Sequence, residues 1–118
     1  MKTKLMLAAA LMAAAVLPAN AGEPISGNEW LSDCTSKIQI RPILCMIYAR
    51  GLADGLQLWA LTNPESARAC IPVKVRTEQL KDIGTRWITN NPKLRHEDAG
   101  YLLAIAFIDA WPCKETSQ

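Results

Sequence analysis

Residues 101–108 read YLLAIAFI, an uninterrupted apolar run near the C-terminal end of the chain. His96-Glu97-Asp98 precede the run and supply the acidic residues that favour a helix start, and Pro112 follows it as a helix stop. A helix that is apolar on every side is stable only when other elements surround it. The run therefore predicts a buried central helix from about residue 96 to residue 110.

Three further helices are expected before this one, at residues 29–37, 43–61 and 77–90. Arg41-Pro42 separates the first from the second, because the residue before a proline disfavours helical geometry. Thr77 is the expected N-cap of the third, and residues 22–28 (GEPISGN) form a flexible leader. No segment alternates apolar and polar residues over the length of a strand, so the predicted fold class is all-α, a small domain of four to five helices.

The helix expected at residues 43–61 carries an apolar stripe and two glycines one turn apart. Each glycine costs a helix about 1 kcal/mol relative to alanine, so Gly51 and Gly55 indicate a close helix contact, inside the domain or across a dimer. A bend in the helix is the alternative. The stripe recurs every three or four residues and is expected to face the core; its members are Leu44, Tyr48, Leu52, Gly55 and Trp59.

Residues 1–21 have the pattern of a secretory signal peptide. Lys2 and Lys4 precede an apolar run that ends at a proline, and the motif ANA favours cleavage before Gly22. The run is shorter than the roughly 20 residues that span a bilayer. We expect a helical domain at residues 22–118 that acts in the periplasm, with no membrane attachment after cleavage.

The four cysteines, Cys34, Cys45, Cys70 and Cys113, all lie in the expected mature part. An even number of cysteines in an exported chain favours disulfides, whereas a zinc site would want closer pairs or histidine partners. Four cysteines allow three connectivities. Up-and-down packing of the last three helices would favour Cys34–Cys45 and Cys70–Cys113.

The sequence offers no set of residues for catalysis. His96 is the only histidine, and it lies at a helix start beside Glu97 and Asp98, which point about 100° apart on a helix. No serine or cysteine has the setting of an activated nucleophile. We therefore expect no enzyme activity, no cofactor and no metal.

Charge makes nucleic acid an unsuitable partner. The 13 basic residues fall to 11 when Lys2 and Lys4 are removed, which balances the 11 acidic residues and leaves no basic surface.

Several motifs anchored on cysteines occur in an order that resembles the Rap/Tai family of immunity proteins against type VI secretion amidases. The resemblance extends from about Cys34 to Cys113. The chain departs from the family pattern at Ile47, where glycine is common, at Trp111, where phenylalanine is common, and at Lys93, near a usual glutamate. The matching motifs are Cys45-x-x-Tyr48-x-x-Gly51-x-x-Asp54, Cys70-Ile71-Pro72, Gln79-Leu80, Asn91-Pro92-x-Leu94, Ala99 and Ala106-x-x-Asp109-Ala110-Trp111-Pro112-Cys113.

The resemblance implies a helical, often dimeric periplasmic protein that binds a peptidoglycan amidase effector and occludes its active-site groove. Such occlusion needs no chemistry from the inhibitor, which agrees with the absence of catalytic motifs. Three alternatives stay open: a small periplasmic chaperone of the acid-stress kind, an enzyme or enzyme subunit, and a similar binding protein with another partner.

The residues expected to contact the partner are Asn91, Lys93, Arg95 and His96, in the connection at residues 90–96 (NNPKLRH). Helices flank this short segment on both sides, so it loses little entropy on binding. Residues 62–69 are the competing loop.

Overall fold

The computed structural model describes residues 22–114, which fold into one helical domain, and the predicted all-α class is confirmed. The expected signal peptide at residues 1–21 lies outside the described residues. Between residues 22 and 114 the only β-pairing is two isolated bridges, Ser26 with Asp98 and Ala69 with Pro112. The helices are α1 (Gly27–Cys34), α2 (Ile40–Thr62), α3 (Thr77–Asn90) and α4 (Ala99–Ala110), with a 3-10 turn, η1 (Pro92–Leu94), before α4.

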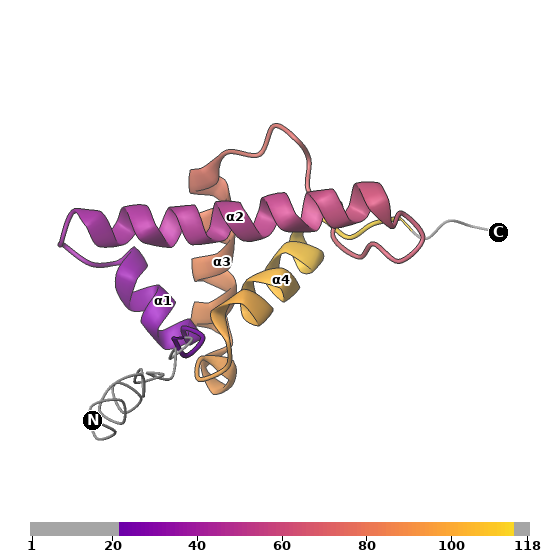
Figure 1. Cartoon of the computed structure of the whole chain (residues 1–118). Coiled ribbons are helices and arrows are strands. Elements are labelled where there is room, and N and C mark those ends of the chain that lie inside the picture. The colour runs from indigo at the N-terminus through magenta and orange to yellow at the C-terminus, as the bar shows by residue number, and fades with distance from the viewer. Residues whose placement is uncertain (1–21, 115–118) are drawn as a thin grey trace, which may run out of the picture.

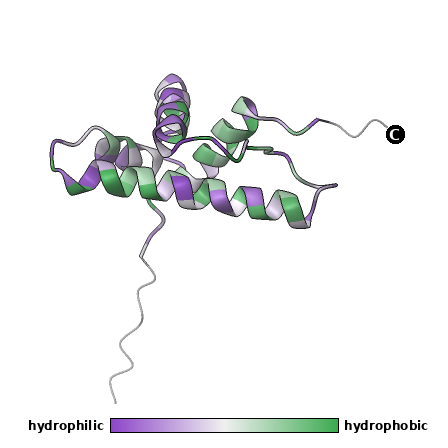
Figure 2. Ribbon diagram, turned by 90° about the horizontal axis from the view of Figure 1, so that it is seen from above, coloured by the Kyte–Doolittle hydropathy of each residue, from purple (hydrophilic) through white to green (hydrophobic). Residues whose placement is uncertain are grey.

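The long helix α2 lies along one side of the molecule. The other three helices all pack against the face of α2 that points into the molecule (Figure 1 and Figure 2). α3 crosses α2 steeply instead of running antiparallel to it (Figure 1). The expected up-and-down packing is therefore wrong. The crossing leaves both ends of α2 beyond the region that α3 covers.

α4 provides most of the core, as its sequence predicts. Leu102, Leu103 and Phe107 have no exposed surface, and they pack with Trp30 of α1 and Leu80 of α3. The Trp30 indole donates to the carbonyl oxygen of Cys45 at 3.3 Å, so its one polar atom is paired inside the core. Other buried members of this cluster are Ile71, Ile88 and Ala99.

α2 buries only part of the stripe that its sequence predicts, because Tyr48 and Leu52 are half-buried against the core while other members are exposed. Its buried residues are the small ones, Cys45, Ala49 and Ala53, which let α3 and α4 approach the backbone. Leu44 and Trp59 are 51% and 53% exposed. Nearly the whole surface of α2 is apolar, so periodicity does not single out the face that packs.

The glycines of α2 make no close contact within the described chain. A Cβ atom placed on Gly51 or Gly55 meets nothing within 4 Å, whereas one placed on Gly84 of α3 lies 2.3 Å from Leu103 Cδ2 and 2.9 Å from Trp30. The predicted contact at Gly51 and Gly55 is thus wrong inside the domain. Gly84 fills that role, where α3 passes over α1 and α4.

Helix limits differ from expectation in several places. α1 spans Gly27–Cys34 and not residues 29–37, and α4 begins at Ala99 and not near His96. α2 begins at Ile40 and includes Pro42 in its first turn, where the missing N–H has no helical partner to lose. Thr77 lies inside α3 instead of capping it, and its hydroxyl accepts from Arg50 Nε at 3.1 Å. The N–H of Arg76 donates to the Gln79 side chain at 3.0 Å.

Both disulfides have the expected connectivity. Cys34–Cys45 joins the end of α1 to α2, and Cys70–Cys113 joins the α2–α3 loop to the segment after α4. The second pair meets because these two segments run side by side, with backbone hydrogen bonds from Cys70 N to Trp111 O (2.8 Å) and from Cys113 N to Arg68 O (3.0 Å).

Candidate partner-binding loop

Residues 91–98 connect α3 to α4 and form the end of the molecule farthest from α2, at the lower edge of Figure 1. η1 makes the first half of the connection, and Pro92 fixes its first backbone angle. Pro92, Lys93 and Leu94 are all exposed. The connection is therefore a short, structured projection.

Two of the four predicted contact residues are engaged by the end of α3. Asn91 donates from Nδ2 to the Trp87 carbonyl at 2.7 Å, and Arg95 donates from Nε to the Ile88 carbonyl at 3.1 Å and from Nη2 to the Thr89 carbonyl at 2.5 Å. The last carbonyls of a helix have no partner within it, so these side chains complete α3. Asn91 and Arg95 hold the loop in place.

Lys93 and His96 are the two predicted residues that reach solvent. Both are exposed, and His96 Nε2 lies 3.2 Å from Glu97 Oε1. Lys93 borders a shallow hollow of about 390 Å³, which is lined by residues 90–94. The outward face of the loop thus combines a cation, an imidazole and the apolar edge of Leu94, which is 37% exposed.

Ile25 and the first residues of α1 fix the other side of the loop. Gly27 N donates to Glu97 O at 2.9 Å, Asn28 N donates to Arg95 O at 2.8 Å, and Ala99 N donates to Ile25 O at 2.8 Å. Gly27 is needed there, because a Cβ atom would lie 2.6 Å from Leu102 Cδ1. The expected flexible leader is thus ordered from Ile25 onward.

A capping box at the start of α1 stabilises this pairing. Ser26 N donates to Glu29 Oε2 at 2.7 Å, and Glu29 N donates to Ser26 Oγ at 3.3 Å. The hydrogen bonds from Ser26 lower the pKa of Glu29 below its usual value. The pattern Ser26-x-x-Glu29 can be read in the sequence as the start of a helix, although it does not reveal the pairing with the loop.

Asp98 plays the matching role at the start of α4, where its Oδ1 accepts from Tyr101 N at 2.9 Å. Tyr48 of α2 lies close by, and burial, with the charge of Asp98 as a smaller cause, raises its pKa. The loop is therefore closed at both ends by capped helices.

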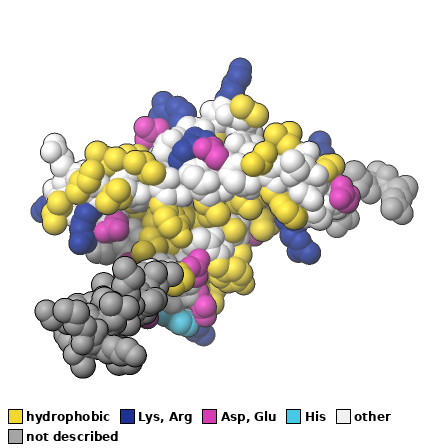
Figure 3. Space-filling model, viewed as in Figure 1, with side chains coloured by type: hydrophobic (Ala, Val, Ile, Leu, Met, Phe, Trp, Pro, Cys, Tyr) yellow, Lys and Arg dark blue, Asp and Glu magenta, His cyan; other side chains and the backbone are white. Residues whose placement is uncertain are grey.

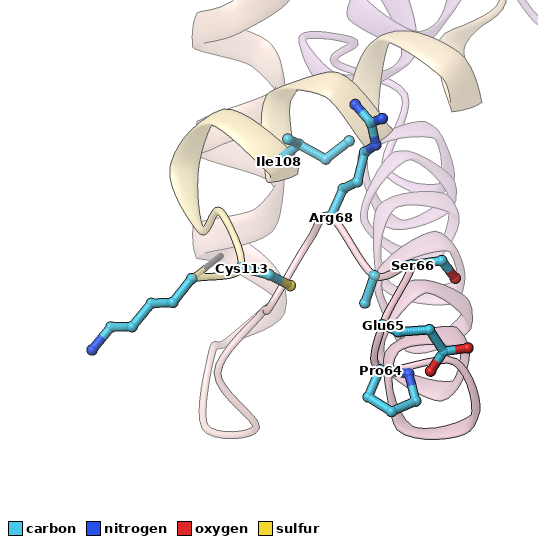
Figure 4. Close-up of a pocket in the computed structure, with 8 residues that line it drawn as sticks. Pro64, Glu65, Ser66, Arg68, Ile108 and Cys113 are labelled. Carbon is cyan, nitrogen blue, oxygen red and sulfur yellow. The ribbon is translucent and has the colours of Figure 1, made fainter. Parts of the chain in front are cut away.

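The competing loop, residues 62–69, borders an open hollow of about 630 Å³. In Figure 4 the Glu65 carboxylate and the Ser66 hydroxyl point away from Cys113, while the Arg68 side chain lies beside Ile108. These polar groups diverge, so the hollow lacks the convergent set that orients a ligand.

The described residues contain no group of three or more histidine, cysteine, aspartate or glutamate side chains that could hold a metal ion. No helix between residues 22 and 114 is both long enough and apolar enough to cross a membrane.

A family model for the Rap1a immunity proteins matches residues 26–113. The chain belongs to this family. The match begins at the Ser26 cap of α1 and ends at Cys113 of the second disulfide, so it includes the candidate loop and the whole core. Membership among the Rap1a immunity proteins assigns the chain an immunity role through binding of a cognate effector. Neither a curated protein nor a solved structure matches the chain significantly.

Proposed function

We propose that this Rap1a immunity protein acts in the periplasm, where it binds a peptidoglycan amidase effector of type VI secretion and occludes its active-site groove. The observation that carries the proposal is the loop at residues 91–98 on a domain of the immunity family. Lys93 and His96 would contact the groove, and Asn91 and Arg95 would hold the loop in its inserted shape.

The fixed shape of the loop supports this role. Binding a groove immobilises whatever enters it, and a segment that is already ordered loses less entropy when it binds. Hydrogen bonds to the α3 carbonyls on one side and with residues 25–28 on the other remove that freedom in advance. In residues 62–69 the backbone pairing with a second element is confined to one end, where the Arg68 carbonyl accepts from Cys113 N at 3.0 Å and Ala69 pairs with Pro112.

The direct test is capture of the effector followed by an activity assay. The protein, expressed from its full-length sequence, should retain a Cys–His amidase encoded beside its gene and abolish the release of peptides from purified peptidoglycan by that enzyme. Failure to bind and inhibit that amidase, with a different protein captured instead, contradicts the amidase assignment.

Substitutions in the two loops should identify which loop contacts the amidase. Lys93→Ala combined with His96→Ala should weaken amidase binding at least about tenfold, a size typical of contacts that matter at an interface, without changing the melting temperature. The matched control in the other loop, Glu65→Ala with Ser66→Ala, should bind like the unmodified protein. The reverse result assigns the contact to residues 62–69. Arg95→Ala is unsuitable here, because it also removes the hydrogen bonds that end α3.

Export has its own test. The protein recovered from the periplasmic fraction should have the intact mass of a chain that begins at Gly22, since the sequence before it has the signal-peptide pattern. An exported protein that retains residues 1–21 contradicts cleavage at that position.

A further inference from the structure

The two disulfides differ in how far solvent reaches them. Cys45 is 1% exposed and Cys34 packs against the buried core, so Cys34–Cys45 is part of the interior. Cys70 is exposed, and Cys113 is only half-buried. A thiolate attacks a disulfide only where it has access to one of the two sulfur atoms. The bridge that a thiolate can reach in the folded protein is therefore Cys70–Cys113.

Cys70–Cys113 lies at the end of the molecule where the α2–α3 loop runs beside the segment after α4, at the right of Figure 1. Figure 3, in the same view, shows charged side chains at this end. Cys113 lines the open hollow of about 630 Å³ together with residues 64–68. In Figure 4 its sulfur atom points toward the loop that carries Arg68. The bridge thus borders an open, polar surface that a second protein can approach.

Basic residues flank the bridge on both segments. Arg68 lies two residues before Cys70, Lys114 follows Cys113, and both basic residues line the hollow. Positive charge close to a cysteine stabilises its thiolate. Glu65 is a carboxylate of the same hollow, but it points away from Cys113 (Figure 4). A thiolate that forms on Cys113 therefore lies in surroundings that favour it.

Other contacts hold the two segments together besides the covalent bond. The neighbours of Cys70 in the chain, Ala69 and Ile71, are 4% and 6% exposed and anchor the loop in the core. Cys70 N also donates to Trp111 O at 2.8 Å, and a second backbone hydrogen bond joins the same two segments. The two sulfur atoms would therefore stay close together after the bond between them is broken, so the bridge can form again.

We propose that Cys70–Cys113 is a site of reversible thiol–disulfide exchange with a protein that carries a reactive dithiol of the Cys-x-x-Cys type. The first thiolate of that protein attacks Cys70 Sγ and forms a mixed disulfide with it. The Cys70–Cys113 bond breaks in this step, and Cys113 leaves as a thiolate.

The second thiol of the dithiol protein completes the exchange. Once deprotonated, it attacks that protein's own sulfur in the mixed disulfide and releases Cys70 as a thiolate. The dithiol protein is oxidised to a disulfide by two electrons, and the bridge is reduced to two cysteines. The two protons that the dithiol loses end on Cys70 and Cys113.

Reduction of this bridge changes the chain locally. The segment after α4 is then held to the α2–α3 loop by backbone hydrogen bonds and packing alone, so it can open without the rest of the domain. Residues 91–98 lie at a different edge of the molecule (Figure 1). The exchange site is therefore independent of the identity of the effector.

The test compares the two bridges within the same native molecules, expressed from the full-length sequence and purified in oxidised form. Dithiothreitol is added for increasing times, free thiols are blocked by alkylation, and mass spectrometry of the peptides measures the reduced fraction of each bridge. Cys70–Cys113 should be reduced at least about tenfold faster than Cys34–Cys45, because its sulfur atoms are accessible. Circular dichroism should show that the helices remain.

Trapping identifies the sulfur atom that is attacked. A thioredoxin-like protein whose second active-site cysteine is replaced by serine stops at the mixed disulfide, which should map to Cys70. Replacement of both Cys70 and Cys113 by alanine should abolish trapping. The matched control, replacement of both Cys34 and Cys45 by alanine, should preserve it.

Equal rates of reduction, or faster reduction of Cys34–Cys45, overturn the proposal. Reduction of Cys70–Cys113 that occurs only together with loss of the helices overturns it as well. A trapped adduct on Cys113, or on either cysteine of the other bridge, contradicts the attack on Cys70. The rates and the adduct are measured on the unmodified protein, so they decide the question even if a variant does not fold.

Discussion

α4 and α2 are both built largely from apolar residues, yet the domain buries most large side chains of α4, except Tyr101, and leaves one face of α2 in solvent. In α4 the large side chains Leu102, Leu103 and Phe107 are fully buried. In α2 the fully buried positions are the small ones, such as Ala49 and Ala53, and many of the large side chains are exposed. An apolar helix face is therefore expected to be covered by other protein atoms. The sizes of the residues on that face decide whether other parts of the same chain can cover it.

The largest difference is expected between matched truncations in the two helices. Leu103→Ala should lower the free energy of unfolding by about 2–5 kcal/mol, because it opens a cavity in the core. Leu58→Ala, at a side chain that is 62% exposed, should change it by less than about 0.5 kcal/mol when the protein is monomeric. Urea unfolding at low protein concentration measures both. Equal losses contradict the contrast between α4 and α2.

Glycine substitutions should change the stability in opposite directions. Gly84→Ala places a methyl group against Leu103 and Trp30, and overpacking of this kind lowers stability by about 1–3 kcal/mol. Gly51→Ala meets open space and should raise the stability of the monomer by about 0.5–1 kcal/mol through helix propensity. The check is thermal melting under monomeric conditions. A loss for Gly51→Ala places a contact at that glycine within the chain.

The contributions of the two disulfides to the free energy of unfolding should differ by a smaller amount. Cys70–Cys113, which holds the end of α4, closes a loop of 43 residues, and Cys34–Cys45, at the start of α2, closes one of 11. Chain entropy then assigns them about 4 and about 3 kcal/mol. Paired replacement of each bridge by alanine, followed by urea unfolding, measures the difference of about 1 kcal/mol. A larger loss for Cys34–Cys45 shows that contacts around α1 outweigh loop length.

The smallest effect concerns helix caps, because α2 begins without a side-chain cap whereas α1 begins with the Ser26–Glu29 box. The folded pKa of Glu29 is lowered, so its carboxylate stabilises the fold above the unfolded pKa, and that contribution is lost as the pH falls through the folded pKa. Glu29→Gln should be less stable than the unmodified protein at neutral pH and equally stable in acid. If the difference in stability persists in acid, the effect comes from the shape of the Glu29 side chain and not from its charge.

Local signals in the sequence predict much of the fold. The limits of α3 match the expected residues 77–90, and the run at residues 101–108 became the core of α4. The disulfide partners were also correct, although α3 crosses α2 instead of running beside it. The predicted disulfide pairing is still correct because it depends only on which connecting segments lie together. Cys70 and Cys113 lie together because the backbones of residues 68–70 and 111–113 are paired.

Other features are visible only in the three-dimensional structure. Asn91 and Arg95 look in sequence like outward-facing polar residues, but the carbonyls at the end of α3 lie within their reach. The side of α2 that packs was likewise hidden, because the contrast between Ala53 and Leu58 is one of size and not of polarity. Sequence periodicity reflects only the polarity of the residues, so it does not show which side of α2 packs against the core.

The pairing of residues 25–28 with residues 95–99 has a consequence for imitating the protein. A synthetic peptide with only the sequence of residues 91–98 would lack the N–H groups of Gly27 and Asn28 and the α3 carbonyls that Arg95 binds. Such a peptide would sample many shapes in water and lose that freedom on entering a groove. A miniature inhibitor would therefore need the start of α1, the end of α3 and the start of α4 held together, for which a cyclic or stapled scaffold is the smallest reasonable design.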